Sequence, residues 1–324
     1  MQAPEFWRQD GAVSRLLTPA GWVYGLAGCC RHVFVGTPVE VSVPVICIGN
    51  LVAGGAGKTP VALSLGKRLT ETGKAVHFLS RGYGGAERGP LCVDESQHSA
   101  AQVGDEPILL SRNSPTWVSA DRPAGCMAAV AEGAEVIIMD DGFQNPSVRK
   151  TLSLLVIDGG YGLGNGRMIP AGPLREPPGH ALKRADAVII IGDDETDFAA
   201  MAAAAGVKVL HASIRPDHSA ESLVGRAVVA FAGIGRPEKF FGTLDSIGCD
   251  LRATHAYPDH FPYRVEEIEN LRESARRENA ALVTTEKDIV RIDPGAREGI
   301  ETLTITLQWR DEVALEAVLR PALD

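Results

Sequence analysis

A glycine-rich loop between an apolar run and a helix-like stretch constrains this chain more than any other feature. The loop is Gly54-Gly55-Ala56-Gly57-Lys58-Thr59, with the apolar run 45–48 before it and the helical stretch 60–70 after it. Glycines allow backbone N–H groups to surround phosphate oxygens, and the first turn of the following helix adds the positive end of its dipole. This order of strand, loop and helix predicts an α/β fold with a phosphate-binding site.

Individual positions of the loop have separate tasks in such a site. Lys58 can reach the β- and γ-phosphates of ATP, and the Thr59 hydroxyl can bind Mg²⁺. Position 52 is Val52, where the usual G-x-x-x-x-G-K-T pattern has glycine. A glycine-rich turn with a chance lysine is the structural alternative. The residues predicted to bind the nucleotide are Val52, Ala53, Gly54, Gly55, Ala56, Gly57, Lys58 and Thr59.

A second apolar run ends in two acids. Asp140 and Asp141 directly follow the run 136–139. An acid at the carboxyl end of a buried parallel strand faces the crevice where ligands lie in such sheets, and it can hold Mg²⁺. Taken alone, an Asp-Asp-Gly turn is more often an ordinary loop start. Together with the glycine-rich loop, it indicates a metal site formed by Thr59, Asp140 and Asp141.

Strand-like runs alternate with helical stretches through most of the chain. This pattern favours a P-loop NTPase-type, mostly parallel sheet with helices on both faces. The composition turns polar near 213–222, and a second α/β pattern follows, with strands expected at 228–232, 282–285 and 303–307. We therefore expect an N-terminal helical segment at 1–36, a P-loop domain at 37–220 and a smaller α/β domain at 221–324.

The segment before the loop has a different character. No charged residue lies between Leu16 and Cys30, and Thr18-Pro19 predicts a helix start. The apolar run is shorter than the roughly 20 residues that a spanning helix needs. Trp22 and its neighbours suit the headgroup region and favour a helix on a membrane surface. A helix packed on the protein core is the alternative, and the pattern alone does not separate the two.

Composition excludes several classes of function. The net charge of −9 argues against a nucleic-acid partner. The six cysteines form no C-x-x-C pair, so no zinc site or redox motif is indicated. The first residues lack the pattern of a signal peptide, and nothing implies an obligate protein partner.

Several polar motifs could be structural or functional on their own pattern. Gly104-Asp105-Glu106-Pro107 suits an ordinary helix start as well as a catalytic role. The same ambiguity holds for 80–84 and 172–177. His260 lies in a turn-like stretch, where a lone histidine is usually structural or solvated.

Taken together, these motifs resemble the tetraacyldisaccharide 4'-kinase family, the lipid A 4'-kinases of Gram-negative bacteria. The likeness covers about residues 15–310, and the family also lacks the first loop glycine. Asn145 departs from it, because the family commonly has histidine there, so that position receives no role. The matching runs are 49–51, 54–60, Ser80-Arg81-Gly82-Tyr83-Gly84, Gly104-Asp105-Glu106-Pro107, Asp140-Asp141-Gly142-Phe143-Gln144, Gly172-Pro173-Leu174-Arg175-Glu176-Pro177, 233–235, 258–260 and Thr284-Thr285-Glu286-Lys287-Asp288.

The resemblance implies a kinase that uses ATP and Mg²⁺ to phosphorylate the 4'-hydroxyl of a tetraacylated glucosamine disaccharide 1-phosphate, forming lipid IVA. It implies a place on the cytoplasmic face of the bacterial inner membrane, held by the N-terminal helix. It makes Lys58 and Asp105 catalytic, with His260 as the partner of Asp105 from the second domain. The implied substrate contacts are Tyr83, Glu106, Arg122, Gln144, Arg175 and Glu176.

Three other classes of protein share part of this pattern. A membrane-recruited ATPase switch usually has K-G-G-x-G-K-T, but Ala53 replaces its signature lysine. A GTP-dependent metal chaperone needs an N-K-x-D motif, which is absent. A non-catalytic interaction module would leave the phosphate-binding loop without a purpose.

Overall fold

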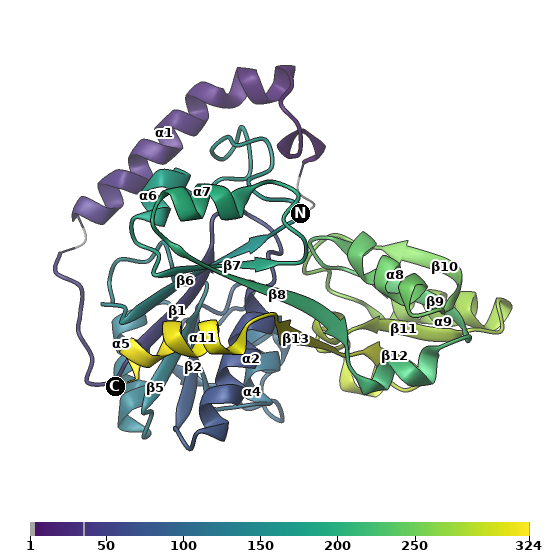
Figure 1. Cartoon of the computed structure of the whole chain (residues 1–324). Helices are drawn as coiled ribbons and strands as arrows, with labels where there is room; N and C mark the ends of the chain where they lie inside the picture. The colour runs from purple at the N-terminus through teal and green to yellow at the C-terminus, as the bar shows by residue number, and fades with distance from the viewer. Residues whose placement is uncertain (1–3, 35, 324) are drawn as a thin grey trace.

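The computed structural model describes the backbone of residues 4–34 and 36–323, and the side chains of these residues apart from 29–34. Its described part contains two sheets that lie side by side (Figure 1). The large sheet has nine strands, in the spatial order β13 (Ile305–Trp309), β8 (Lys208–Pro216), β7 (Ala187–Ile191), β6 (Leu152–Asp158), β1 (Val45–Asn50), β5 (Val136–Asp140), β2 (Val76–Ser80), β4 (Thr116–Val118) and β3 (Leu91–Cys92).

The large sheet is parallel apart from its two edge strands. β13 and β3 run antiparallel to their neighbours. Strands β1, β5, β6 and β7 are buried at every position, as expected for parallel strands that helices cover on both faces. This confirms the predicted fold class, and it explains why these strands read as continuous apolar runs.

Helices cover both faces of the large sheet. On one face, α2 (Lys58–Glu71) and α11 (Glu312–Leu319) contribute to the same core cluster as Ile46 and Ile48. On the other face lie α5 (Arg122–Ala131), α6 (Pro178–Leu182) and α7 (Phe198–Ala204). The short helices α3 (Ala100–Val103) and α4 (Asp105–Ser111) follow β3 in the chain.

The small sheet has four parallel strands in the order β10 (Asp250–Ala256), β9 (Ala227–Ala232), β11 (Ala281–Thr285) and β12 (Ile300–Leu303). Helix α8 (Pro237–Ser246) packs on one face and α9 (Val265–Arg277) on the other. The short helix α10 (Glu286–Ile289) directly follows β11. We refer to this sheet and its helices as the small domain.

The C-terminal residues correct one sequence prediction. The expected strand 303–307 is divided at Thr304 between β12 of the small sheet and β13 of the large sheet. The last part of 221–324 therefore belongs to the large sheet, where α11 lies in yellow beside α2 (Figure 1). Trp309 is buried there and donates its indole N–H to Ser64 Oγ at 2.9 Å. An apolar run does not reveal which of two sheets it will join.

Helix α1 (Ala12–Phe34) lies along the outside of the molecule (Figure 1). It begins before the predicted start at Thr18, and Pro19 lies inside it. Proline removes one backbone hydrogen bond here, while the Thr18 hydroxyl donates to the Ser14 carbonyl at 2.8 Å. Within the described part of the chain, no helix combines the length and the apolar character that a membrane crossing would need.

Candidate active site

The topology brings the two phosphate and metal motifs together. β1 leads into the glycine-rich loop, β5 ends at Asp140, and the two strands are neighbours with Ile48 paired to Asp140. The carboxyl ends of parallel strands meet at one edge of a sheet, where ligands bind in such folds. The fold therefore places the loop and both acids at a single edge.

The loop is shaped by its own sequence. The buried side chain of Asn50 donates to the carbonyls of Val52 at 2.8 Å and Gly54 at 3.3 Å. Gly57 has a φ of +85°, and a Cβ there would lie 2.5 Å from Ile191 Cδ1, so only glycine fits. Val52 forms a strand-like bridge with Leu174. This bridge accounts for a valine where the usual pattern has glycine.

Free backbone donors line the loop. Among the described residues, the backbone N–H groups of 54–57 have no hydrogen-bond acceptor. The first N–H groups of a helix also lack partners within that helix, and α2 begins at Lys58. Such a set of donors at a helix N-terminus fits an anionic group such as phosphate.

Lys58 and Asp141 lie beside this loop. The Lys58 ammonium is 3.7 Å from Asp141 Oδ1, which also accepts from Arg175 at 2.7 Å. Burial alone would raise the pKa of Asp141, but the charges of Lys58 and Arg175 lower it to about 2. Asp141 is therefore an ionised partner for two cations.

Asp140 has the opposite surroundings. It is 1% exposed, and neither carboxylate oxygen has a hydrogen-bond partner among the described residues. Burial, together with the negative charge of Glu106, raises the pKa of Asp140 to about 7. An unpartnered buried carboxylate is costly unless a cation joins it. This orphaned group fits a Mg²⁺ ion, and Thr59, the other predicted ligand, lies in the first turn of α2.

The small number of metal-binding side chains at this edge is also compatible with Mg²⁺. Within the described residues, no three His, Cys, Asp or Glu side chains gather into a metal cage. Mg²⁺ in kinases usually takes one or two carboxylates together with the oxygens of substrate phosphates and water. The orphaned carboxylate of Asp140 is compatible with that mode, whereas Asp141, also predicted as a metal ligand, already pairs with Lys58 and Arg175.

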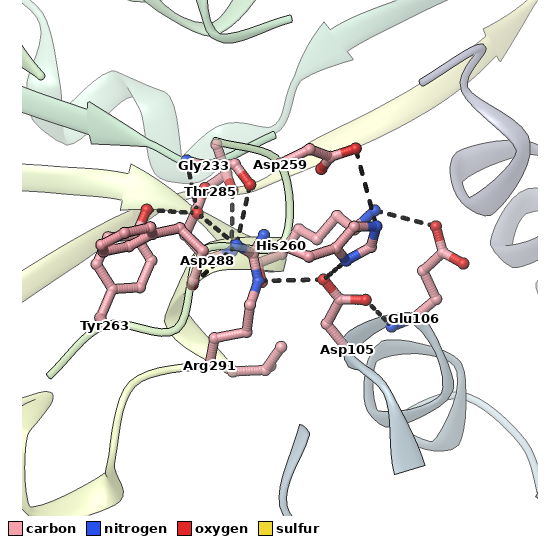
Figure 2. A network of polar contacts seen from close by, with 12 residues as sticks. Asp105, Glu106, Gly233, Asp259, His260, Tyr263, Thr285, Asp288 and Arg291 are labelled. Carbon is pink, nitrogen blue, oxygen red and sulfur yellow. Dashed lines mark hydrogen bonds and ion pairs between the residues drawn. The ribbon is translucent and has the colours of Figure 1, made fainter. Parts of the chain in front are cut away.

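A second group of charged residues joins the large and small domains (Figure 2). Asp105 at the start of α4 is 3% exposed. Its Oδ2 atom lies 2.9 Å from His260 Nδ1 and 3.1 Å from Arg291 Nε. Burial alone would raise the pKa of Asp105, but Lys287, His260 and Arg291 together hold it well below its usual range. The carboxylate is thus ionised and fixed in place.

His260 reaches Asp105 because of a strained turn. Its backbone has a φ of +59°, and its N–H donates to the Gly233 carbonyl at 3.1 Å. Positive φ is uncommon for residues other than glycine and costs energy, so the surrounding contacts must hold it. The exposed Tyr83 ring lies 5.4 Å from the imidazole, between ring centres, and Nε2 lies 3.8 Å from Asp259.

Further residues hold this turn, and their sequence pattern alone indicates no role for them. Arg291 donates to the Gly233 carbonyl at 2.9 Å, and Asp288 accepts from the Gly233 N–H at 2.8 Å and from the Tyr263 hydroxyl at 2.7 Å. Lys287 is 3.0 Å from Glu106. The motif at 284–288 carried a signal for Lys287 and Asp288, but nothing in the sequence singled out Arg291 or Tyr263.

The remaining predicted substrate residues lie in different settings. Gln144 donates to Glu176 at 3.0 Å and to the Asn50 carbonyl at 2.9 Å, so it lies beside the loop. Arg122 is buried, donates to the Ser119 carbonyl and leaves its Nε without a partner among the described residues. Burial and the nearby charge of Arg81 lower the pKa of Arg122.

Comparison with known proteins gives consistent results. The model of the family described as "Tetraacyldisaccharide-1-P 4'-kinase" matches residues 13–324. A tetraacyldisaccharide 4'-kinase of Paramagnetospirillum magneticum is 53% identical over 95% of each chain. One of Rhodospirillum rubrum is 49% identical over 98% of this chain and 97% of its own. The crystal structure of LpxK from Aquifex aeolicus in complex with ATP superposes with a TM-score of 0.78 at 26% identity, covering 96% of this chain and 100% of that one.

Proposed function

Because this chain belongs to the tetraacyldisaccharide-1-phosphate 4'-kinase family, we propose that it transfers the γ-phosphoryl group of ATP to the 4'-hydroxyl of a tetraacylated glucosamine disaccharide 1-phosphate, using the residues described above. The observation that carries this proposal is the contact of Asp105 with His260 at 2.9 Å. This contact places an ionised carboxylate beside an imidazole, in a fold that also has a loop of free N–H donors.

In the proposed reaction, the backbone of the loop holds the α- and β-phosphates, and Lys58 reaches the β- and γ-phosphates. Mg²⁺ held by Asp140 and Thr59 would neutralise charge on the phosphate oxygens. Asp141 orients Lys58 through their ion pair at 3.7 Å. Phosphoryl transfer needs mainly positioning and charge stabilisation, and these residues supply both.

Asp105 and His260 act on the acceptor. The 4'-oxygen forms a bond to the γ-phosphorus as the bond to the β–γ bridging oxygen breaks, ADP leaves, and the hydroxyl proton passes to the Asp105–His260 pair. A carboxylate held by Lys287 and Arg291 is a weak base, so the proton moves late, when the sugar oxygen has already lost charge to phosphorus. Asp105 then mainly orients the hydroxyl.

The reaction is tested with purified protein, labelled Mg-ATP and the disaccharide 1-phosphate lipid. We expect label in the lipid, and none in a 4'-deoxy analogue of the same lipid. Transfer to the 4'-deoxy lipid would contradict the assigned hydroxyl. Hydrolysis of ATP without any labelled lipid would favour an ATPase switch instead.

We also propose that α1 rests on the cytoplasmic face of the inner membrane. Its exposed apolar side chains include Leu16 at 81%, Trp22 at 70% and Leu26 at 67% exposure. Ser14, on the same helix, is fully buried and bonds Asn165. One part of the helix therefore packs on the protein while apolar side chains face outward, as in helices that lie on membranes.

Surface substitutions test this better than deletion, because Asn165 also binds the carbonyl of Phe6 and a deletion would disturb that packing. The variant Trp22→Ser with Leu26→Ser should release the protein from anionic vesicles in a flotation assay. Its KM for the lipid should rise several-fold while its KM for ATP stays constant. Unchanged flotation would argue against the membrane surface.

A further inference from the structure

The small domain touches the glycine-rich loop through the turn between β9 and α8. Arg236 in this turn donates from Nη2 to the Gly55 carbonyl at 2.6 Å. The preceding Gly235 packs so closely that an added Cβ would lie 3.0 Å from the Gly55 nitrogen. The small domain therefore contacts the glycine-rich loop at Gly55.

Arg236 is itself held firmly. Its Nη2 also pairs with Asp158, which ends β6 and whose side chain is 6% exposed. The guanidinium lies 5.1 Å from the centre of the Tyr161 ring. Its side chain is 15% exposed. A charged donor fixed by an ion pair and an aromatic ring loses little entropy when it binds a carbonyl.

The Gly55 carbonyl determines where the next N–H points. A trans peptide is planar, and its C=O and N–H groups point in opposite directions. Holding the Gly55 carbonyl toward Arg236 therefore turns the Ala56 N–H away from the small domain. Glycine-rich loops bind phosphate through backbone N–H groups, and a flexible loop would otherwise have to order this peptide when the nucleotide binds.

We propose that Arg236 is a positioning residue for ATP: it fixes the Gly55–Ala56 peptide and so preorganises the loop for the α- and β-phosphates. The inference rests on the proposed role of the loop in nucleotide binding. It makes ATP affinity depend on the small domain, since Arg236 belongs to that domain while Asp158 and Gly55 belong to the large one.

Lys239 provides a matched control. It pairs with the same Asp158 carboxylate, and it makes no hydrogen bond to the loop among the described contacts. Replacing it removes one cation from the same ion pair without freeing the Gly55 carbonyl. Arg236→Met and Lys239→Met therefore differ mainly in the contact with the loop.

The test is the Kd of ATP and of ADP, each with Mg²⁺, measured on full-length protein by calorimetry. Arg236→Met should weaken both nucleotides about tenfold, as expected for the loss of one charge-assisted hydrogen bond. Lys239→Met should bind within about twofold of wild type, and Arg236→Lys should recover part of the loss because it keeps a positive donor. For Arg236→Met, the KM for ATP should rise in parallel with the Kd, while the KM for the lipid should stay near wild type.

Three results would overturn the inference. The first is normal binding of both nucleotides by Arg236→Met, and the second is a loss of affinity in Lys239→Met as large as that in Arg236→Met. The third is a loss of affinity for ATP alone in Arg236→Met, which would mean that Arg236 contacts the γ-phosphate directly. Should Arg236→Met unfold, Asp158→Asn gives the same test, with a smaller loss for both nucleotides. Lys58→Ala distinguishes a failure of this inference from a failure of the proposed nucleotide site. Normal nucleotide binding by Lys58→Ala would refute the assignment of the loop itself.

Discussion

Asp140 and Asp105 are both buried carboxylates, yet the protein surrounds them in opposite ways. Asp140 has no hydrogen-bond partner among the described residues, and its pKa is raised to about 7. Asp105 contacts His260 and Arg291, and its pKa is held well below its usual range. One carboxylate thus lacks the cation that would stabilise it, while the other already has its cations from the protein itself. This contrast supports the proposed roles of the two groups, with Asp140 as a metal ligand and Asp105 as the group that orients the acceptor.

The largest expected effect tests the phosphate side. Lys58→Ala should lower kcat by about 10³-fold, because the ammonium stabilises charge on the transferring group. Lys67 on the same helix is exposed, and Lys67→Ala should retain normal turnover. Steady-state kinetics on variants with a verified fold measures both. Near-normal turnover of Lys58→Ala would remove the loop lysine from the mechanism.

The next effect separates the two adjacent acids. Asp140→Asn should lower kcat by about 10²-fold and raise the Mg²⁺ concentration needed for half-maximal rate, because a metal ligand has lost its charge. Asp141→Asn should also be impaired, but through Lys58, so its Mg²⁺ requirement should change little. A Mg²⁺ titration of both variants distinguishes these cases. The reverse pattern would exchange the assignments of the two acids.

A smaller effect concerns stability without metal or nucleotide. The raised pKa of Asp140 means that its ionisation destabilises the fold, a penalty that grows as pH rises from about 4 to about 7. Asp140→Asn should therefore stabilise the metal-free protein by about 1–3 kcal/mol at pH 8, and by less at pH 5.

Asp105 should behave in the opposite way. Its lowered pKa means that the ionised form stabilises the fold above about pH 4, and that this contribution is lost as pH falls further. Asp105→Asn should cost about 2–3 kcal/mol at pH 7, because it leaves buried cations with fewer partners. Denaturant unfolding with chelator present measures both variants. Shifts of the same sign would contradict the contrast between the two carboxylates.

The sequence predicted the phosphate side better than the acceptor side, for a physical reason. The loop, Lys58 and Thr59 form one continuous strand, turn and helix, whose chemistry is local. Asp105 and His260 are 155 positions apart, and only the resemblance to a known family paired them. Arg291 remained hidden, since an arginine after a short helix carries no pattern of its own.

Two errors about the fold have the same origin. Pro19 was predicted to start a helix, but a single lost backbone bond does not stop α1 when Ser14 is packed against Asn165. The run 303–307 was placed in the small domain, because an apolar pattern does not specify a partner strand. In both cases tertiary contacts determine the structure, namely where the helix begins and which sheet the strand joins, and the local sequence pattern does not specify it.

In the proposed reaction Asp105 and His260 act as one unit on the acceptor hydroxyl, and a double-mutant cycle on kcat tests this coupling. Asp105→Asn keeps a residue suited to a helix start but lacks the charge. We expect Asp105→Asn and His260→Ala each to lower kcat by about 10²-fold or more with little change in ATP affinity, and the double variant to be hardly worse than the poorer single variant. A near-normal rate for Asp105→Asn, or fully additive losses in the double variant, would contradict the account.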